Sequence, residues 1–197
     1  MDWSLVLQIV GTTLGFLYLW LEYKANIWLW VVGALMPMVH GVLYLQSGIY
    51  ADAAMQLYYV LAGIYGLCVW RRGSSAKKEM AITHTPIGWV LPLVLVYVML
   101  NIALYFLLTE FTDSQVPLFD SISTALSIVA MWMLSRKLVE QWLVWLVVDA
   151  ISVGLYFYKG IPITGCLYLV YCVLAVVGYI RWMREVRKGG GTESEDK

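Results

Sequence analysis

The chain has 197 residues, of which 61% are hydrophobic and 13% are charged, against about 25% charged residues in a typical soluble domain. Its formal net charge is +0 and its mean hydropathy is +0.75, and a soluble domain of this size has too little interior to bury so much apolar surface. These values exclude a disordered chain and a nucleic-acid-binding protein, and they indicate one polytopic membrane domain over residues 1–188.

Seven apolar segments follow one another along the chain, each close to the ~20 residues that a helix needs to cross a hydrocarbon core of roughly 30 Å. The predicted transmembrane helices cover residues 3–21, 27–46, 50–70, 88–108, 116–135, 139–158 and 162–182. The longest connection, between the third and fourth helices, contains Gly73 and Pro86, two residue types that end helices. Residues 189–197 are Gly-rich and then charged, and we expect a disordered cytoplasmic tail there.

Lysine and arginine are distributed unevenly over the predicted loops. Of the 13 basic residues, only Lys159 falls on the side that holds the N-terminus and the loops after the second, fourth and sixth helices. All the others, including Arg71-Arg72 and Arg136-Lys137, fall on the opposite side. Because basic loops stay in the cytoplasm, we expect the N-terminus outside and the C-terminus in the cytoplasm.

Identical residues recur at an offset of 112 positions without a gap. The matched pairs include Trp20 and Trp132, Trp30 and Trp142, Tyr59 and Tyr171, Gly66 and Gly178, and Trp70 and Trp182. Shared hydrophobicity does not explain matched aromatic residues and glycines, so we predict two copies of a three-helix unit, over 3–70 and 116–182, with a linker helix over 88–108 between them. The odd linker makes the two copies parallel, a 3+1+3 plan found in transporters that bind substrate between their halves.

The sixth predicted helix carries an acid near its middle. Asp149 lies in an apolar run, and an acid at such a depth costs roughly 2.5–3.5 kcal/mol, so its side chain should face a cavity or a partner. Steps of three and four residues place Trp142, Trp145, Ser152 and Tyr156 on the same helix face. Indole faces attract cations, so this stripe suits a flat, cationic, hydroxylated ligand. The alternative is that the tryptophans anchor the helix at the membrane interface and Asp149 bonds a neighbouring helix.

The first repeat contributes further candidates on two helices. In the third predicted helix, Asp52, Gln56 and Tyr59 form a stripe, and the amide of Gln56 suits a carboxamide, a pyrimidine or a ribose hydroxyl. The alternatives are an interhelical hydrogen bond for Gln56 and a charge at a helix N-terminus for Asp52. In the second helix, His40 is a candidate proton carrier or ligand contact, with an ordinary buried hydrogen bond as the alternative.

Several chemistries are missing from the sequence. It has no His-Glu-x-x-His motif, no phosphate-binding glycine loop and no Cys-x-x-Cys pair, so we expect no metal, no cofactor and no ATP-driven pump. A nucleophile paired with a base is not evident either, which argues against an enzyme. A retinal protein needs a lysine deep inside a helix, whereas Lys159 falls at a helix end.

The chain resembles the PnuC family over nearly its whole length. The resemblance is carried by the run Ser135-Arg136-Lys137-Leu138-Val139-Glu140-Gln141-Trp142-Leu143-Val144-Trp145, which contains Arg-Lys-x-x-Glu-x-Trp-x-x-Trp. It is also carried by Tyr50-Ala51-Asp52-Ala53-Ala54-Met55-Gln56, by Ile64-Tyr65-Gly66, by Tyr156-Phe157-Tyr158-Lys159-Gly160 and by Gly178-Tyr179-Ile180-Arg181-Trp182. The resemblance implies an all-α, SWEET-like fold of seven transmembrane helices and a homotrimer.

The same resemblance implies a facilitator of vitamin-precursor uptake in the bacterial inner membrane, typically of nicotinamide riboside, with relatives that carry thiamine. It implies downhill transport with trapping by cytoplasmic phosphorylation, and it places Trp142, Trp145 and Gln56 at the substrate site. This chain has Asp149, Gly63 and Val177 where some nicotinamide riboside members have Asn, which leaves the vitamin open between nicotinamide riboside and thiamine. A sensor without transport activity and a membrane enzyme are the alternatives from other classes.

Overall fold

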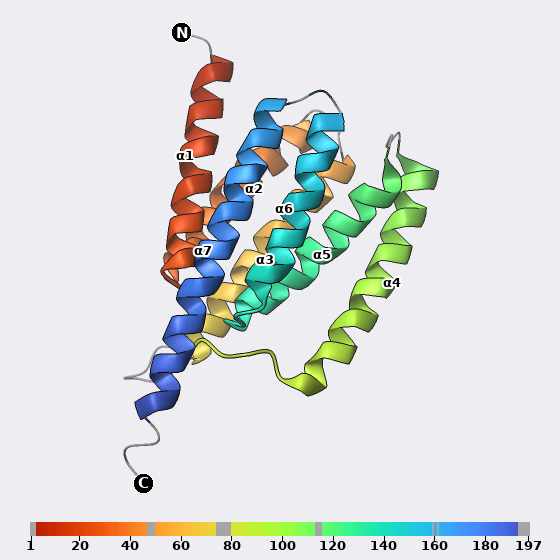
Figure 1. Ribbon diagram of the computed structural model, residues 1–197. Helices are drawn as coiled ribbons and strands as arrows, with labels where there is room; N and C mark the ends of the chain where they lie inside the picture. The colour runs from red at the N-terminus through yellow and green to blue at the C-terminus, as the bar shows by residue number, and fades with distance from the viewer. Residues whose placement is uncertain are drawn as a thin grey trace. The chain divides into compact units, whose positions relative to one another are not determined.

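The computed structural model describes residues 3–46, 50–73, 80–112, 116–158, 160 and 162–192. In these ranges the chain is all-α and forms seven helices, which Figure 1 shows. Their bounds are α1 (Trp3–Tyr23), α2 (Trp28–Gln46), α3 (Tyr50–Gly73), α4 (Ile87–Phe111), α5 (Pro117–Ser135), α6 (Gln141–Tyr158) and α7 (Pro162–Thr192). The prediction of seven helices is therefore confirmed. Helix α7 is longer than predicted, because it includes residues 189–192, which we expected in a disordered tail.

Four helices are long and apolar enough to cross a membrane within the described part of the chain. They are α4, α5, α6 and the stretch Gly165–Lys188 of α7. No residue of α4 is fully buried, and one side of this helix packs against α5. These properties identify a multi-pass membrane protein, because only helices of this length satisfy their own backbone hydrogen bonds in a bilayer.

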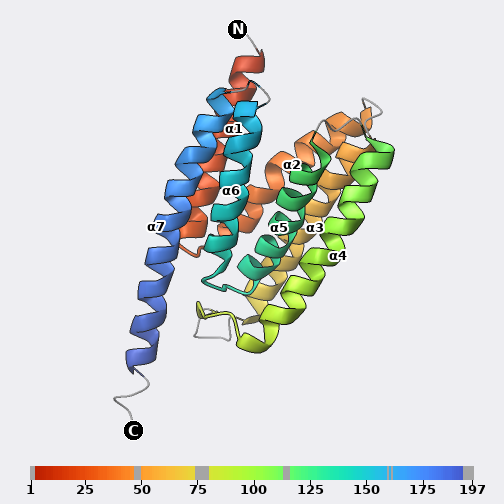
Figure 2. The same cartoon turned by 45° about the vertical axis from the view of Figure 1, so that its right-hand side comes forward.

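The chain divides into two compact units, Met1–Met80 and Ala81–Lys197. In the first unit α2 packs against both α1 and α3. In the second unit α6 packs against both α5 and α7, and α4 packs against α5 (Figure 2). In each triplet, therefore, the middle helix packs against the other two: α2 in the first unit and α6 in the second.

The turn between the first two helices of each triplet has the same backbone geometry. Ala25 has a φ of 50° and Lys137, which follows it by 112 positions, has a φ of 52°; this left-handed conformation is uncommon for residues other than glycine. The amide of Ala25 donates to the carbonyl of Glu22 at 2.8 Å, and that of Lys137 donates to the carbonyl of Leu134 at 2.9 Å. Such a specific pair of turns supports the duplication inferred from sequence.

Side chains at the ends of these helices repeat in the same way. The ammonium of Lys24 lies 5.4 Å from the ring centroid of Trp20, and the guanidinium of Arg136 lies 5.6 Å from that of Trp132. Both pairs stand at the end of the first helix of their triplet. A cation over an indole at a helix end is the arrangement expected at a membrane–water boundary.

A short segment before α4 is bound to the loop between α5 and α6. Thr83 donates its amide to the carbonyl of Lys137 at 3.1 Å and accepts from the amide of Val139 at 3.0 Å. The carboxylate of Glu140 accepts from His84 Nδ1 at 2.7 Å and from the amide and hydroxyl of Thr85, each at 2.8 Å. Partial burial acts to raise the pKa of Glu140, but these hydrogen bonds outweigh it and lower the pKa below its usual value.

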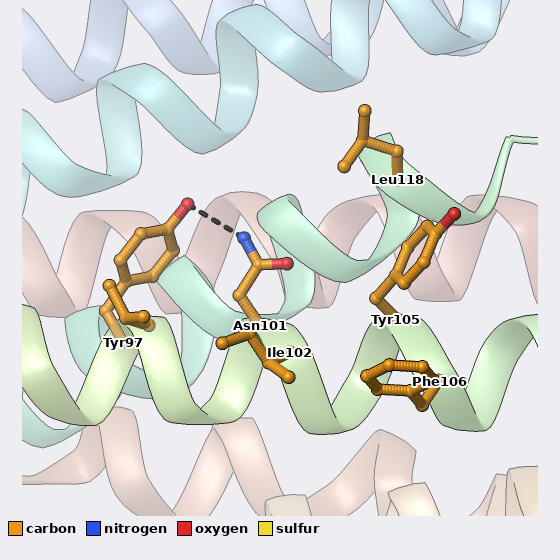
Figure 3. Close-up of a pocket in the computed structure, with 7 residues that line it drawn as sticks. Tyr97, Asn101, Ile102, Tyr105, Phe106 and Leu118 are labelled. Carbon is orange, nitrogen blue, oxygen red and sulfur yellow. Dashed lines mark hydrogen bonds between the residues drawn. The ribbon is translucent and has the colours of Figure 1, made fainter.

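Helix α4 is attached to α5 by hydrogen bonds beside a shallow groove of about 280 Å³ (Figure 3). The side-chain amide of Asn101 donates to the hydroxyl of Tyr97 at 3.1 Å, and its oxygen accepts from the hydroxyl of Ser121 at 3.0 Å. Figure 3 shows Tyr105, Phe106 and Leu118 along the rest of this groove. Asn101 therefore joins the linker helix to the second triplet through an interhelical hydrogen bond.

Candidate functional site

The stripe predicted on α6 is present and its acid is buried. Asp149 is 7% exposed and Ser152 is 8% exposed, and Trp145 and Tyr156 are partly buried. The hydroxyl of Ser152 donates to the carbonyl of Val148 at 2.9 Å, within the same helix. Asp149 therefore does not point to lipid. This placement is expected because an acidic side chain exposed to the bilayer interior is energetically costly.

The described residues around Asp149 are polar, and none of them is a cation. Its carboxylate interacts electrostatically with Tyr168, Tyr171 and Cys172 of α7. Among the described residues, Asp149 has neither a hydrogen bond nor an ion pair. The ion pair in the described part of the chain lies elsewhere, between His84 and Glu140. A buried acid surrounded by neutral groups is costly unless a positive group meets it, so the site is suited to a cationic ligand.

Two tyrosines beside Asp149 were missed by the sequence interpretation. The ring of Tyr168 stacks on that of Tyr156 with centroids 5.2 Å apart and planes at 15°, and it meets Tyr171 edge-on at 5.5 Å. Tyr168 and Tyr171 stand 112 positions after Gln56 and Tyr59. The internal repeat was therefore a usable signal, because Gln56 and Tyr59, both selected in α3, have aromatic counterparts at the same offset in α7.

Trp142 is buried in the interface between α6 and α7. It is 2% exposed, its ring meets Trp182 edge-on at 5.7 Å and 90°, and it covers Gly178, where an added Cβ would lie 2.7 Å from its ring. In the first unit Trp30 makes the same contacts with Trp70, at 5.6 Å and 89°, and with Gly66. These contacts hold adjacent helices together, and the role of Trp142 as a substrate contact stays a prediction.

Trp145 differs from Trp142 in its surroundings. It is only partly buried, whereas Trp142 is 2% exposed. The ring N–H groups of both tryptophans are shielded from solvent, and neither has a hydrogen-bond partner among the described residues. A shielded donor of this kind is satisfied by an acceptor that a bound molecule brings. Trp145 thus offers both an aromatic face and a hydrogen-bond donor one helical turn before Asp149.

The candidates of the first unit are less completely described. Gln56 and Tyr59 lie on α3 and are partly buried, and Tyr59 meets Tyr58 edge-on at 5.4 Å. The side chains of Asp52 and His40 lie outside the described residues. The predictions for these two residues therefore stand as they were made.

The described hollows and clusters do not add a second chemistry. The groove on α5 and α6 is lined by Val116, Phe119, Ala150, Ile151, Gly154, Leu155 and Tyr158, none of which belongs to the α6 stripe. Within the described residues, no three His, Cys, Asp or Glu side chains are arranged to hold a metal ion. The features around Asp149 are thus aromatic rings, hydroxyls and the acid itself, which bind ligands and do not by themselves perform a reaction.

Long apolar helices, a repeated triplet and a buried acid among aromatic residues define a multi-pass membrane transporter. The chain matches the family model described as nicotinamide mononucleotide transporter over residues 5–184, and it belongs to this family, which includes PnuC. Membership confirms the family resemblance found in the sequence. The relatives are transporters, in agreement with the expectation that the chain is not an enzyme.

Relatives with known names cover most of the chain. It is 27% identical to the nicotinamide riboside transporter PnuC of Escherichia coli strain K12, over 93% of this chain and 87% of that protein. It is also 27% identical to the riboflavin/roseoflavin transporter RibM of Streptomyces davaonensis, over 94% and 87%. A crystal structure of the vitamin B3 transporter PnuC has the same fold, with a TM-score of 0.67 and 23% identity over 89% of this chain and 79% of that one.

Proposed function

We propose that the protein facilitates the uptake of a cationic vitamin precursor across the bacterial inner membrane, and that nicotinamide riboside is the favoured substrate. The observation that carries the proposal is Asp149, which is buried on α6 beside Tyr168 and Tyr171 with no cation near it among the described residues. Nicotinamide riboside is a flat cation that bears hydroxyl groups. Similarity to the Escherichia coli transporter of that vitamin supports the same choice.

Each site residue has a distinct role in the proposed complex. Trp145 stacks on the pyridinium ring, Asp149 faces its positive charge, and Gln56 and Tyr59 bond the polar edges. Trp142 contributes from behind, because its packing on Trp182 holds the stripe of α6 in place. Ser152 and Tyr156 continue the same stripe toward the outer side, and Asp52 and His40 remain candidates from the first unit.

Thiamine is the alternative substrate, because it is also a flat cation with a hydroxyl group and would make the same contacts. The relative RibM is named for riboflavin, which is neutral and has no positive charge for Asp149 to balance. Riboflavin is therefore the informative comparison. A preference for the two cations over riboflavin is the pattern that the buried acid predicts.

In the proposed transport cycle, two parallel three-helix units with α4 as the linker enclose one central site and rock to give alternating access. The N-terminus lies outside and the C-terminus in the cytoplasm, an orientation that the distribution of basic residues supports. The functional form is a homotrimer in which each chain has its own site. Transport runs downhill, and phosphorylation of the substrate in the cytoplasm keeps it inside the cell.

The proposal is tested by binding and uptake with the purified, full-length protein. Nicotinamide riboside, thiamine and riboflavin are titrated separately while tryptophan fluorescence is followed, and we expect quenching at micromolar nicotinamide riboside. Uptake into vesicles that contain the protein then separates a transporter from a sensor, which binds but does not move the vitamin. Absence of quenching by all three compounds would contradict vitamin binding, and binding without uptake would contradict transport.

A further inference from the structure

Glu140 begins α6 with its backbone and holds a distant segment of the same unit with its side chain. Its carbonyl accepts from the amides of Leu143 at 3.0 Å and Val144 at 3.3 Å, within the first turn of the helix. Its carboxylate accepts from His84 and Thr85, just before α4. The start of α6 is therefore attached to a point 55 residues earlier in the chain.

The turn that leads into α6 is held by the same segment. Thr83 bonds through its backbone to both sides of Leu138, and the two residues form a parallel bridge. Leu138 is 2% exposed and Val139 is fully buried. The side chains packed around Leu138 come from three helices of this unit: Leu93 and Tyr97 of α4, Val129, Trp132 and Met133 of α5, and Val144 of α6. These contacts fix the rotation and the height of the first turn of α6.

Helix α2, the equivalent of α6 in the first unit, begins with a local contact. Glu140 corresponds to Trp28 at the offset of 112 positions, and Trp28 is 62% exposed. The backbone amide of Trp28 donates to the side chain of Asn26 at 3.0 Å, as at an ordinary helix N-terminus. A helix of this type thus starts from its own turn, so the need to start α6 does not account for the long-range bonds of Glu140.

The residues proposed to bind the vitamin follow Glu140 on the same helix. Trp145 stands five positions after Glu140 and Asp149 stands nine positions after it, which is about 8 Å and 14 Å along the helix axis. The side-chain tips of a helix lie ~5–6 Å from its axis, so a rotation of roughly 20° moves them by about 2 Å. A shift of that size is enough to take an aromatic ring out of stacking contact with a ligand.

We propose that Glu140 is a positioning residue for the vitamin site, because its bonds to His84 and Thr85 set the rotation of α6 and thereby the direction of the Trp145 ring. This inference rests on the proposed function, in which Trp145 stacks on the vitamin. Glu140 acts through the helix and does not touch the vitamin. Its removal therefore weakens binding of any vitamin that stacks on Trp145, whatever the charge of that vitamin.

The inference is tested first by the Kd of nicotinamide riboside, or of thiamine if that is the vitamin bound. Without the bonds of Glu140, the positioned state is only part of the population, and the Kd rises by the inverse of its fraction. We expect a Kd raised about three- to tenfold in Glu140→Ala. His84→Ala should have a smaller effect, because the two bonds from Thr85 remain.

A matched control separates positioning from a general loss of stability. Asn101→Leu breaks the bond between α4 and α5 in the same unit but leaves the start of α6 attached, so its Kd should stay within twofold of the unaltered protein. A lower melting temperature with an unchanged Kd in Glu140→Ala would overturn the inference. An equally raised Kd in Asn101→Leu would overturn it as well.

A double-mutant cycle tests whether Glu140 acts through Trp145. In a Trp145→Leu background there is no indole to position, so adding Glu140→Ala should change the Kd by less than it does in the unaltered protein. The same factor in both backgrounds would show that Glu140 and Trp145 act independently, which the inference excludes.

The fluorescence of Trp145 provides a readout that needs no ligand. Its emission is the difference between the spectra of the unaltered protein and of Trp145→Phe, and the same difference is measured in the Glu140→Ala background. We expect a shift in the emission maximum when the bonds of Glu140 are removed, and an unchanged maximum would overturn the inference. If the unaltered protein binds none of the vitamins, the proposed function fails, and this emission still decides whether Glu140 positions Trp145.

Discussion

The indole of Trp142 meets the indole of Trp182 edge-on, with ring centroids 5.7 Å apart and ring planes at 90°. The same pair occurs 112 residues earlier as Trp30 and Trp70, at 5.6 Å and 89°. Edge-to-face packing places the positive rim of one ring on the negative face of the other. We call each of these edge-to-face tryptophan pairs a tryptophan joint. It lies between the second and third helices of its triplet and fixes how these two helices cross.

The tryptophan joint of Trp142 and Trp182 needs a glycine at position 178, where the Trp142 ring lies. We therefore predict that Gly178→Ala destabilises the protein. An added Cβ would lie 2.7 Å from Trp142, and the indole cannot move without losing its contact with Trp182. Overpacking of this kind costs about 1–3 kcal/mol. The measurement is the thermal unfolding of the detergent-solubilised protein, in which Gly178→Ala should melt several degrees lower.

Two further variants separate this effect from a general effect of alanine. Gly66→Ala places its Cβ against Trp30 and should lower the melting temperature similarly, because it attacks the equivalent joint. Gly154→Ala adds the same methyl group where nothing lies within 4 Å and should leave the melting temperature unchanged. Equal stability in all three variants would show that the indoles yield freely and that the joint is not a rigid element.

The helices and the repeat were predictable from sequence for a clear physical reason. A helix in a bilayer needs a long apolar run whatever its neighbours are, so each of α1 to α6 begins and ends close to its predicted bounds. The end of α7 was not predictable in the same way. Three consecutive glycines at 189–191 favour a break, yet the helix continues to Thr192.

The contacts of single side chains were less predictable than the helices. The α6 stripe correctly placed Asp149 in a buried position, because the cost of an acid in lipid is a local property. It did not separate Trp142, which is almost fully buried against Trp182, from Trp145, which is only partly buried. The bond between Glu140 and His84 was missed, because the two residues are 56 positions apart and no spacing rule connects them.

That bond leads to a prediction for the segment before α4. In Glu140→Gln the neutral amide replaces a carboxylate that accepts from His84 and from Thr85. Hydrogen bonds to a charged group contribute about 1.5–3 kcal/mol when buried, and partial exposure reduces this to roughly 1 kcal/mol. We expect a lower melting temperature at pH 7, whereas Glu110→Gln at the exposed end of α4 should change nothing.

The effect should depend on pH in a defined direction. The folded-state pKa of Glu140 lies below its ordinary value of 4.5, so the ionised group stabilises the fold above that value and the contribution is lost as the pH falls through the folded pKa. The difference in melting temperature between the unaltered protein and Glu140→Gln should therefore be full at pH 7 and shrink in acid. A difference that grows on acidification would contradict this assignment.

The bond between Asn101 and Ser121 predicts how firmly α4 is held on α5. Asn101→Leu removes the acceptor for Ser121 and the donor for Tyr97, and interhelical hydrogen bonds in membranes contribute about 0.6 kcal/mol on average. We expect a loss of this size in stability, measured by unfolding in detergent. Ser121→Ala in the Asn101→Leu background should cost less than Ser121→Ala alone; equal costs would show that the two side chains do not interact.

The last prediction concerns the charge of Asp149. Asp149→Asn keeps the shape and polarity of the side chain but removes the negative charge, so it should weaken binding of nicotinamide riboside or thiamine by about ten- to a hundredfold, at 1.4 kcal/mol per tenfold change. Removing the charge should also relieve the cost of burying it, so the melting temperature without ligand should not fall. The measurement is the Kd from tryptophan fluorescence, beside thermal unfolding.

Riboflavin supplies the control, because it has no positive charge to lose contact with Asp149. Any riboflavin binding should be equal or tighter in Asp149→Asn, since a neutral side chain is easier to desolvate beside a neutral ring. Parallel losses for cationic and neutral vitamins would mean that the carboxylate acts by shape or hydrogen bonding. An unchanged Kd for the cations would remove Asp149 from the site, and the aromatic residues of α6 and α7 would then have to account for binding alone.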